Sequence, residues 1–433
     1  MRKIKGISPP HNKNTEFTKV RNLPVPAEVH IPMKMHSGRP AVPVVGVGDE
    51  VQIGQLIGEL GGRVSSPVHA SVSGCVKSIN ERDPVTGQKA VSITIASDGK
   101  QTYYEGLKPP TVTTLQEFYD ACQDSGSVGL GGAGFPVAPK LAIKNLDDLD
   151  YILINGAECE PYVTADTRSM VANYRHVYGG VKLLLEYMRP GKVIICIEDN
   201  KAEAINVMRE TFAGEEKVEV RVLPTSYPQG ERKVLVYNVT GRIVPEGARL
   251  ADVGVIVSNV STVAVISQYV ETGLPLVSKV VTVDGPAVKT PRNVHAPIGT
   301  TIRDIFDFCD GFISEPRKVI IGGPMMGFAQ ASLDVPIVKT TNCLIACSDM
   351  STVFPKETAC IKCGRCLTKC PMKLMPPNIE TAFLLENVDK LKHYKVNMCV
   401  ECGCCAYICP AKRKLVQVMQ LSKDMLWKRE NKV

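Results

Sequence analysis

The middle third of the chain alternates short apolar runs with amphipathic segments of helical spacing. The apolar runs that suit buried strands cover residues 150–154, 192–197 and 254–257. The helical patterns between them cover residues 176–188 and 201–211. Strands that alternate with helices are typical of a layered α/β domain. We therefore predict an α/β domain over residues 110–272.

The longest uncharged run of the sequence, residues 253–270, lies at the end of this domain. Its length is close to the roughly 20 residues that cross a bilayer. The run contains polar side chains that are costly in lipid, namely Ser258, Asn259, Ser261, Thr262, Ser267 and Gln268. We predict a buried strand, a polar turn and a helix instead of a membrane span.

Residues 27–97 follow another pattern, in which short alternating segments are broken by glycine and proline. Short strands between turn residues are typical of a compact all-β unit, which we assign to residues 28–100. The 27 residues before it are rich in proline, lysine and asparagine. For them we expect an extended N-terminal arm that takes no part in the chemistry.

Two cysteine runs near the C-terminus point to chemistry. Each has the spacing Cys-x2-Cys-x2-Cys-x3-Cys-Pro, in which three cysteines hold one 4Fe-4S cluster and the fourth holds the other cluster. The first cluster would take Cys360, Cys363, Cys366 and Cys409, and the second Cys399, Cys402, Cys405 and Cys370. Disulfides or zinc are the alternatives, but a reducing cytosol disfavours disulfides and tetrahedral zinc does not require this run twice. The chain should therefore carry electrons, with Cys404 as a spectator.

Composition narrows the class of protein. A length of 433 residues exceeds what one core usually organises, so about two to four domains are expected. The net charge is +7, but no basic stretch is interleaved with aromatic residues, which argues against nucleic acid as a partner. The sequence has no apolar stretch after its first residues that could act as a signal peptide, and its 16 cysteines fit the reducing cytosol.

Much of the positive charge follows the last cysteine run. Seven lysines and arginines between residues 412 and 432 are opposed only by Asp424 and Glu430. Apolar residues between Leu415 and Trp427 have the spacing of a helix with an apolar side. This basic tail would either dock onto a membrane partner or an anionic lipid surface, or pack onto the chain's own cysteine-rich module.

A glycine-rich loop at residues 127–140 opens the α/β domain. Glycines let backbone N–H groups approach a phosphate, and Lys140 can supply countercharge. The loop and the strand end at residues 155–161, Asn-Gly-Ala-Glu-Cys-Glu-Pro, resemble the flavin site of the NADH-oxidising subunit of respiratory complex I. Two further phrases match the same family, Tyr227-x2-Gly230-Glu231 and Asn259-Val260-x-Thr262.

This resemblance implies a site for FMN and NAD(H). The FMN phosphate would be held by Gly129, Gly131, Gly132 and Lys140. The flavin would be lined by Asn155, Glu158, Tyr227, Gly230, Glu231, Asn259 and Thr262. Glu160 would lie at the nicotinamide as the catalytic residue. Two positions depart from the family pattern and affect the detailed flavin contacts: Leu130 replaces the usual arginine of the loop, and Ala157 replaces an aspartate.

The other regions also resemble known modules. Residues 28–100 are similar to a lipoyl or biotinyl carrier barrel, but the hairpin tip at 67–71 lacks the modifiable lysine, so we expect a structural role. Residues 273–340 resemble the β-grasp module that follows the flavin domain in the same family. The fold class is then multidomain: a carrier-like β barrel-sandwich, an α/β FMN domain, a β-grasp module and, at residues 350–433, an α-helical two-cluster ferredoxin domain.

The order of these domains resembles that of the RnfC subunit of the Rnf complex, the ion-translocating ferredoxin:NAD oxidoreductase. The resemblance implies an enzyme, peripheral on the cytoplasmic face of the inner membrane, that exchanges electrons between NAD(H), FMN and two 4Fe-4S clusters. Its partners would be the other Rnf subunits, including an iron-sulfur subunit. Two alternatives remain: a soluble FMN and iron-sulfur cobalamin reductase of the same architecture, and a non-enzymatic electron relay with a decayed flavin site.

Overall fold

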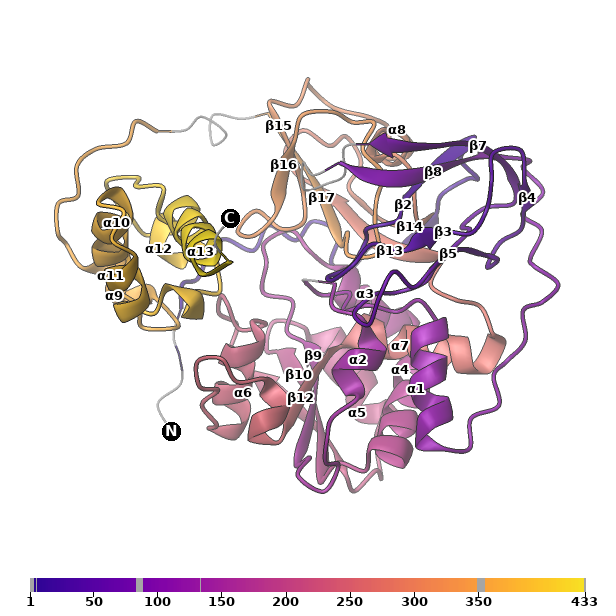
Figure 1. The fold of residues 1–433 in the computed structure, drawn as a ribbon, viewed down its shortest axis with the longest axis horizontal. Coiled ribbons are helices and arrows are strands. Elements are labelled where there is room, and N and C mark those ends of the chain that lie inside the picture. The colour runs from indigo at the N-terminus through magenta and orange to yellow at the C-terminus, as the bar shows by residue number, and fades with distance from the viewer. Residues whose placement is uncertain (1–3, 5, 83–88, 133, 349–354, 432–433) are drawn as a thin grey trace.

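The computed structural model describes residues 4, 6–82, 89–132, 134–348 and 355–431. Figure 1 shows an α/β domain at the bottom, a β-domain at the right, a β-grasp module at the top and a helical cysteine-rich module at the left. Within the described residues, no helix combines the length and the apolar character needed to cross a membrane.

The β-domain consists of two antiparallel sheets that pack face to face. Its strands are β2 (Glu28–Pro32), β3 (Val42–Pro43), β4 (Glu50–Val51), β5 (Leu56–Glu59), β6 (Val68–His69), β7 (Gly74–Arg82) and β8 (Ala90–Ser97). The sheet orders are β2-β8-β7-β4 and β3-β5-β6. Alternate residues of β2 and β8, such as Val29, Ile31, Ile93 and Ile95, are fully buried, as the period of two in a strand requires.

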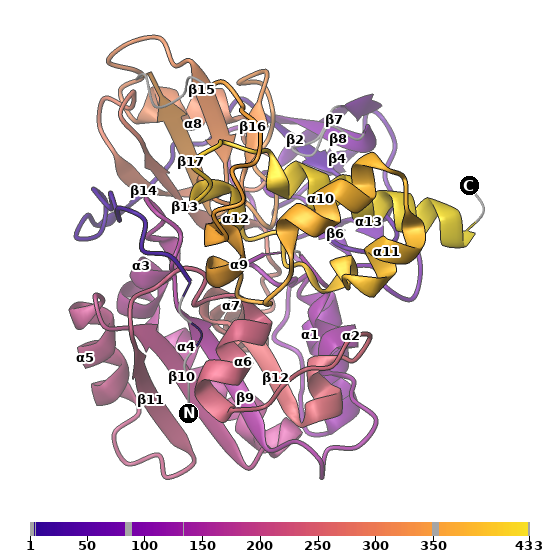
Figure 2. The same cartoon turned by 90° about the vertical axis from the view of Figure 1, so that its left-hand side faces the viewer.

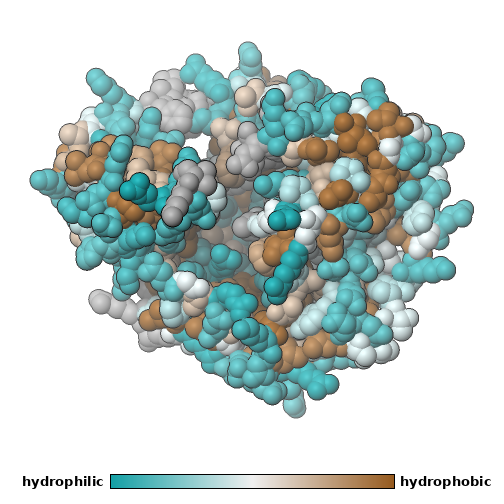
Figure 3. Space-filling model, viewed as in Figure 1, coloured by the Kyte–Doolittle hydropathy of each residue, from teal (hydrophilic) through white to brown (hydrophobic). Residues whose placement is uncertain are grey.

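The hairpin tip at residues 67–71 is fixed in place. The buried Lys339 ammonium donates to the carbonyl oxygens of Pro67 (2.6 Å) and Gly126 (2.7 Å). Ser71 Oγ donates to the carbonyl oxygen of Ile298. These contacts agree with the structural role that the sequence predicts, because a swinging carrier arm needs a free tip. Figure 3 shows apolar side chains over this domain at the upper right, and its exposed apolar residues include Val42, Val44, Val47 and Leu56.

The α/β domain is built on a parallel sheet of order β11-β10-β9-β12. Its elements are α1 (Leu115–Asp124), α2 (Val137–Leu141), β9 (Tyr151–Gly156), α3 (Ala165–Ala172), α4 (Tyr174–Leu183) with a π-helical turn (Leu184–Met188), β10 (Lys192–Glu198), α5 (Ala202–Thr211), β11 (Val218–Leu223), α6 (Arg232–Thr240), a 3-10 turn (Leu250–Val253), β12 (Val255–Asn259) and α7 (Val260–Thr272). The predicted strands and helices of this domain are confirmed.

The parallel sheet is covered on both faces, which explains its uninterrupted apolar strands. In β9 and β10, Ile152 and Ile195 belong to one buried cluster, and Leu153 and Ile194 belong to the cluster on the opposite face. The predicted turn between β12 and α7 is absent. Asn259 is both the last residue of β12 and the N-cap of α7, so the strand leads directly into the helix.

The β-grasp module contains a six-stranded sheet of order β1-β14-β13-β17-β15-β16. Its elements are β1 (Val20–Asn22), β13 (Ser278–Asp284), β14 (Arg292–Pro297), α8 (Ile302–Phe308), β15 (Lys318–Ile321), β16 (Phe328–Gln330) and β17 (Cys343–Cys347). The sheet extends past the predicted range of 273–340 at both ends, because it takes β17 and also β1 from the N-terminal arm. Figure 2 shows the indigo arm passing between the β-grasp module above and the α/β domain below.

The C-terminal module consists of short helices closed by one long helix. They are α9 (Arg365–Lys369), α10 (Pro376–Leu384), α11 (Val388–His393), a 3-10 turn (Val396–Met398), α12 (Cys404–Tyr407) and α13 (Leu415–Asn431). Helix α13 is the predicted basic tail. Its residues Met419 and Leu426 are buried against α10 and α11, so the tail packs onto its own module, while Leu421 and Trp427 are exposed.

Candidate functional site

The glycine-rich loop lies at the carboxyl ends of β9 and β12. The chain leaves β9 toward β10 and β11, and then returns to place β12 on the other side of β9. In parallel α/β sheets, ligands bind outside the strand ends at such a switch point. Asn155 of β9 is paired with Asn259 of β12, and a Cβ atom on Gly131 would come within 2.6 Å of Asn259 Nδ2. Gly131 therefore lets the loop approach the switch point closely.

Helix α7 holds the loop. Leu130 N donates to Thr262 Oγ1 (3.0 Å), and Thr262 Oγ1 donates to the carbonyl oxygen of Val128 (3.2 Å). Gly129 N donates to the carbonyl oxygen of Phe135 (2.9 Å). A Cβ atom on Gly132 would meet nothing within 4 Å, so this part of the loop faces open space. Thr262 is fully buried and anchors the loop, and its place beside the flavin stays a prediction.

The position of Leu130 explains why this residue departs from the family pattern. Its side chain is buried in the core of the β-domain, beside Val128, Leu276 and Ile298. A charged side chain there would be buried without a partner, which is costly. The loop is thereby joined to the β-domain, and another residue must supply countercharge for a phosphate.

Lys140 and Arg232 are the cations that remain available at the site. Lys140 is half-buried, and burial lowers its pKa to about 8, with a further contribution from the charge of Arg232. Among the described residues neither side chain has an ion-pair or hydrogen-bond partner. The charge of Arg232 acts on Lys140 and also on the carboxylate of Glu231. A cation without an ion pair, close to a loop with open glycines, fits a bound phosphate.

Three of the predicted flavin-lining residues cap helices. Glu158 accepts from Asp166 N (2.7 Å) at the start of α3. Glu231 accepts from Lys233 N (2.8 Å) at the start of α6, and Asn259 accepts from Ser261 N (3.0 Å) at the start of α7. The two carboxylates offset the partial positive charge of their helix ends. The countercharge for an anion therefore falls to Lys140 and Arg232.

Asn155 and Gly230 join the strand end to the loop before α6. Asn155 Nδ2 donates to the carbonyl oxygen of Gly230 (2.9 Å), and Asn155 Oδ1 accepts from Ala157 N (3.1 Å). A Cβ atom on Gly230 would lie 2.3 Å from the carbonyl oxygen of Ala157, so only glycine fits. Gly230 N also donates to Cys159 Sγ at 3.4 Å.

Glu160 lies against a second glycine-containing loop, residues 322–327, which follows β15. Its Oε2 accepts from Met325 N (3.1 Å), and a Cβ atom on Gly323 would lie 2.3 Å from the same oxygen. Its Oε1 is buried and has no hydrogen-bond partner in the described part of the chain. Burial raises the pKa of Glu160 to about 7. The carboxyl group is therefore poised to hold or release a proton near neutral pH.

Tyr227 connects the α/β domain to the helical module. Its buried hydroxyl donates to the carbonyl oxygen of Cys402 at 2.7 Å. Ile7, Cys402 and Cys404 pack with Tyr227 in one apolar cluster, which Met325 borders. Tyr227 thus lies between the strand-end loops and the second cysteine run, which the sequence alone did not indicate.

Lys13 is a half-buried cation that the sequence analysis missed. Its Nζ donates to the carbonyl oxygens of Glu158 (2.9 Å), Glu160 (3.0 Å) and Val163. Burial lowers its pKa, and the charge of Glu158 opposes that shift. The arm thus fixes the segment that carries Glu160, while the expectation that it takes no part in the chemistry stays a prediction. A single lysine in a polar segment gave no pattern that could have revealed this.

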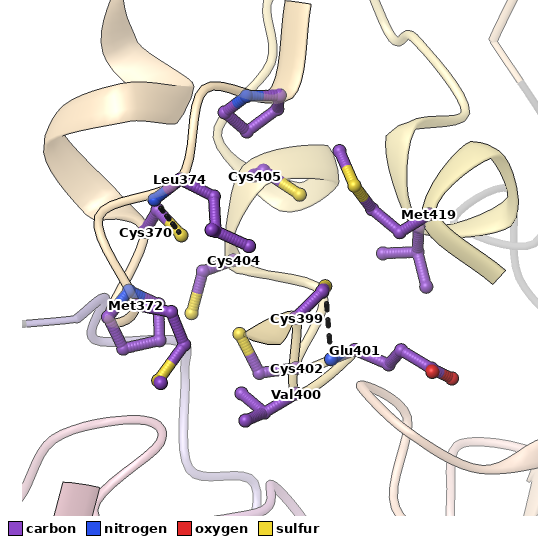
Figure 4. Close-up of a pocket in the computed structure, with 14 residues that line it drawn as sticks. Cys370, Met372, Leu374, Cys399, Val400, Glu401, Cys402, Cys404, Cys405 and Met419 are labelled. Atoms are coloured by element: carbon purple, nitrogen blue, oxygen red, sulfur yellow. Dashed lines mark hydrogen bonds between the residues drawn. The ribbon is translucent and has the colours of Figure 1, made fainter. Parts of the chain in front are cut away.

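The second cysteine run and Cys370 line one pocket, shown in Figure 4. Its walls include Cys370, Cys399, Cys402 and Cys405, the four cysteines that the crossover pattern groups together. Cys404 also lines the pocket, and its Sγ lies 3.9 Å from the carbonyl oxygen of Tyr227. No three His, Cys, Asp or Glu side chains of the described residues converge as ligands of a single ion. The separated thiols fit a cluster that takes one thiolate at each iron.

The first cysteine run is more open. Cys366 and Cys409 are buried together with Ala411 and Leu415. Burial raises the pKa of Cys366, and the nearby Cys409 and Cys360 add to the shift. Cys360 and Cys363 are exposed on the same loop. The structure thus brings Cys360, Cys366 and Cys409 together, and leaves Cys363 at the surface beside them.

Four protein-family models match the chain, and the residues that they match agree with the domains of the structure. The RnfC barrel sandwich hybrid domain matches residues 1–100, and the Nuo51 FMN-binding domain matches residues 122–268. The SLBB domain matches residues 280–329, and a 4Fe-4S dicluster domain matches residues 352–410. These matches confirm the predicted fold class.

Two relatives are similar over nearly the whole chain. The RnfC subunit of the proton-translocating ferredoxin:NAD(+) oxidoreductase complex of Clostridium ljungdahlii is 44% identical, over 96% of this chain and 92% of that protein. The corresponding subunit of the Na(+)-translocating complex of Acetobacterium woodii is 42% identical, over 96% and 95%. The NAD+-reducing NiFe hydrogenase in its H2-reduced state has a similar fold, with a TM-score of 0.50, 17% identity, and coverage of 72% of this chain and 62% of that chain.

Proposed function

The chain belongs to the family of RnfC subunits of Rnf complexes, the ion-translocating ferredoxin:NAD oxidoreductases, and on this premise we propose that it exchanges electrons between NAD(H) and iron-sulfur carriers. It is an enzyme subunit of a membrane-bound electron transport complex, and the other Rnf subunits are its partners. Its cofactors are FMN and two 4Fe-4S clusters. The relatives support this function over a cobalamin reductase or a non-enzymatic relay.

One structural observation supports this function in addition to the similarity to the relatives. The predicted flavin site and the cysteine-lined pocket are in direct contact. Tyr227, in the loop between β11 and α6, donates to the carbonyl oxygen of Cys402 in the pocket wall. Nicotinamides exchange electrons as hydride and clusters exchange them singly, so a flavin must lie between the two. The contact provides a short, buried link between the two regions.

The residues around the predicted flavin site have distinct proposed roles. FMN, when bound, supplies the conversion between hydride and single electrons. Lys140 and Arg232 would hold its phosphate, together with the backbone N–H groups near Gly131 and Gly132. Glu160 would orient the nicotinamide and hold a proton at Oε1. Glu158, Glu231, Asn259, Thr262 and Asn155 would act indirectly, by fixing the loops through the bonds described above.

The two clusters would be held as the cysteine spacing predicts. Cys399, Cys402, Cys405 and Cys370 would hold the cluster next to Tyr227, and Cys360, Cys363, Cys366 and Cys409 the outer one. Cys404 would not be a ligand. The 16 cysteines of the chain, with thiolate-type cluster spacing, suit a reducing compartment, so we assign the peripheral subunit to the cytoplasmic face of the membrane.

The basic test is the cofactor content of the anaerobically purified chain. It should contain about eight iron and eight sulfide ions, as two cubane clusters require. Heat should release FMN and not FAD, and NADH should bleach the flavin and reduce ferricyanide. A chain that retains FAD tightly, or that binds only about four irons, would contradict the proposed function.

Lys140→Ala tests the phosphate site. We expect lower flavin occupancy with unchanged iron content, because the variant removes a cation from the site and nothing from the helical module. Lys144→Ala, an exposed lysine just after α2, is the matched control and should keep its flavin. Equal flavin content in the two variants would exclude the role of Lys140.

Glu160→Gln tests the nicotinamide site. The variant keeps the shape of the side chain and should change the KM for NADH while it retains FMN. Loss of FMN with an unchanged KM would show that Glu160 belongs to the flavin site and not to the nicotinamide site.

A further inference from the structure

The two cysteine loops differ in what covers them. We call residues 360–366 the first cysteine loop and residues 399–405 the second. In the second loop no cysteine is exposed, and Cys402 and Cys404 are buried under Tyr227 and Ile7. In the first loop Cys360 and Cys363 are exposed, and the side chain of Ile361 between them is 64% exposed. One cluster therefore faces the α/β domain, and the other would face solvent.

The surroundings of the first cysteine loop are basic. Residues 355–369 contain Lys356, Lys362, Arg365 and Lys369, and a single acidic residue, Glu357. Glu357 is paired with Arg413 at 3.2 Å. None of the four cations has an ion pair or a side-chain hydrogen bond to any residue that the structure describes. In Figure 1 the chain between the grey trace and α9 runs along the outer left of the molecule, away from the other domains.

Docking of a partner onto the tail helix α13 was one alternative of the sequence analysis. This helix is less suited to bind a partner than the first cysteine loop. Three of the six described cations between residues 412 and 431 are already paired: Arg413 with Glu380, Lys423 with Glu401, and Lys428 with Asp424 at 2.8 Å. Its apolar side faces its own module, as Met419 and Leu426 show. In residues 355–369, by contrast, all four cations lack an ion pair among the described residues, and they adjoin the exposed Cys360 and Cys363.

We propose that residues 355–369 form the docking surface for an acidic iron-sulfur protein that exchanges single electrons with the cluster of the first cysteine loop. This inference deepens the proposed function and rests on its cluster assignment. An exposed apolar side chain with unpaired cations close to it in the chain suits a transient interface, in which complementary charge steers the partner. One electron passes between the reduced cluster of one protein and the oxidised cluster of the other, and no bond forms or breaks.

The test uses the full-length holoprotein and, as a probe, a purified acidic ferredoxin with two 4Fe-4S clusters. The dissociation constant is measured for the wild type, for Lys362→Glu/Arg365→Glu, and for Lys428→Glu/Arg429→Glu, which makes the same change of charge on the tail. We expect the first variant to bind about tenfold more weakly, mainly through a slower association rate, and the tail variant to bind like the wild type.

Salt and a second variant make the test robust. Wild-type affinity should fall between about 0.1 M and about 1 M salt, because screening shortens from about 10 Å to about 3 Å. Lys356→Glu, four residues before the nearest ligand, should weaken binding in the same direction and cannot displace a thiolate. A salt-independent affinity, or equal binding by all variants, would overturn the proposal. A larger loss in the tail variant would overturn it too and assign docking to α13.

Iron, flavin and NADH:ferricyanide activity are measured on every sample. Absence of the outer cluster or of FMN from the wild type would mean that the proposed function itself fails. Full cofactor content and normal ferricyanide reduction in all variants, together with unchanged ferredoxin binding, would reject the docking surface alone.

Discussion

The two cysteine loops have the same backbone and opposite environments. Lys362 and Glu401, at equivalent positions, both have φ of 56°, and Gly364 and Gly403 have φ of 71° and 80°. Ile361 is exposed to solvent, whereas the equivalent Val400 packs beside Tyr227. The local sequence therefore sets the shape of each loop, and the neighbouring domains decide whether it faces inward or outward.

The sequence does differ between the loops where the environments differ. Arg365 of the first loop corresponds to Cys404 of the second, and Lys362 corresponds to Glu401. A buried junction accepts the small Cys404, while an exposed loop accepts the cation. These substitutions could be interpreted only once the structure had shown which loop the α/β domain covers.

The largest expected effect concerns the crossover of ligands between the loops. Cys370→Ala should abolish the cluster of the second loop, and Cys409→Ala that of the first, each leaving about four of about eight irons. Iron analysis and electron paramagnetic resonance of the two variants would measure this. Cys404→Ala is the control and should keep all the iron. If Cys370→Ala removed the cluster of the first loop, the ligand assignment would be reversed.

The next effect concerns the helix that closes the module behind both loops. Leu426→Ala should lower the stability of the module by about 2–4 kcal/mol, because Leu426 is buried and its removal leaves a cavity. Trp427→Ala, at a neighbouring exposed position, should change it by less than about 0.5 kcal/mol. Thermal unfolding followed through the cluster absorbance compares them. Similar losses in the two variants would mean that α13 packs through another face.

The next prediction concerns how folding stability depends on pH, through the buried carboxyl group of Glu160. Folding raises the pKa of Glu160 from 4.5 to about 7, so the native state keeps a proton that the unfolded chain has released. Stability should therefore decrease as pH rises from 4.5 to about 7 and then level off.

Glu160→Gln should remove part of this slope, by about 1 kcal/mol at pH 8 relative to pH 5. Melting temperatures of the two proteins across this pH range would measure the difference. Parallel curves for the wild type and the variant would show that Glu160 does not hold the proton.

The smallest effect concerns the single hydrogen bond across the junction. Tyr227→Phe should destabilise the contact between the α/β domain and the second loop by about 1 kcal/mol, because the carbonyl of Cys402 loses its donor. Tyr407→Phe, on the exposed surface of the same module, should have no measurable effect. Hydrogen exchange of residues 399–405 would reveal a loosened junction, and unchanged exchange would assign the stability of the junction to apolar packing.

The sequence by itself determined the elements and the order of the domains. Apolar runs that alternate with helical patterns predicted the α/β domain, and the repeated cysteine spacing predicted two clusters, since these signals depend on neighbours in the chain. The sequence also indicated a close backbone approach at the glycine-rich loop, and a Cβ atom on Gly131 would come within 2.6 Å of Asn259 Nδ2.

Only the tertiary structure decided how the parts face one another. Lys13 reaches three carbonyl oxygens near Glu160 from about 150 residues away, and Leu130 enters the core of another domain. Glu158 caps a helix, α13 folds back onto its own module, and Tyr227 covers one cysteine loop and not its twin. Contacts between distant segments leave no local pattern, because burial and charge pairing depend on which surfaces meet after the elements have formed.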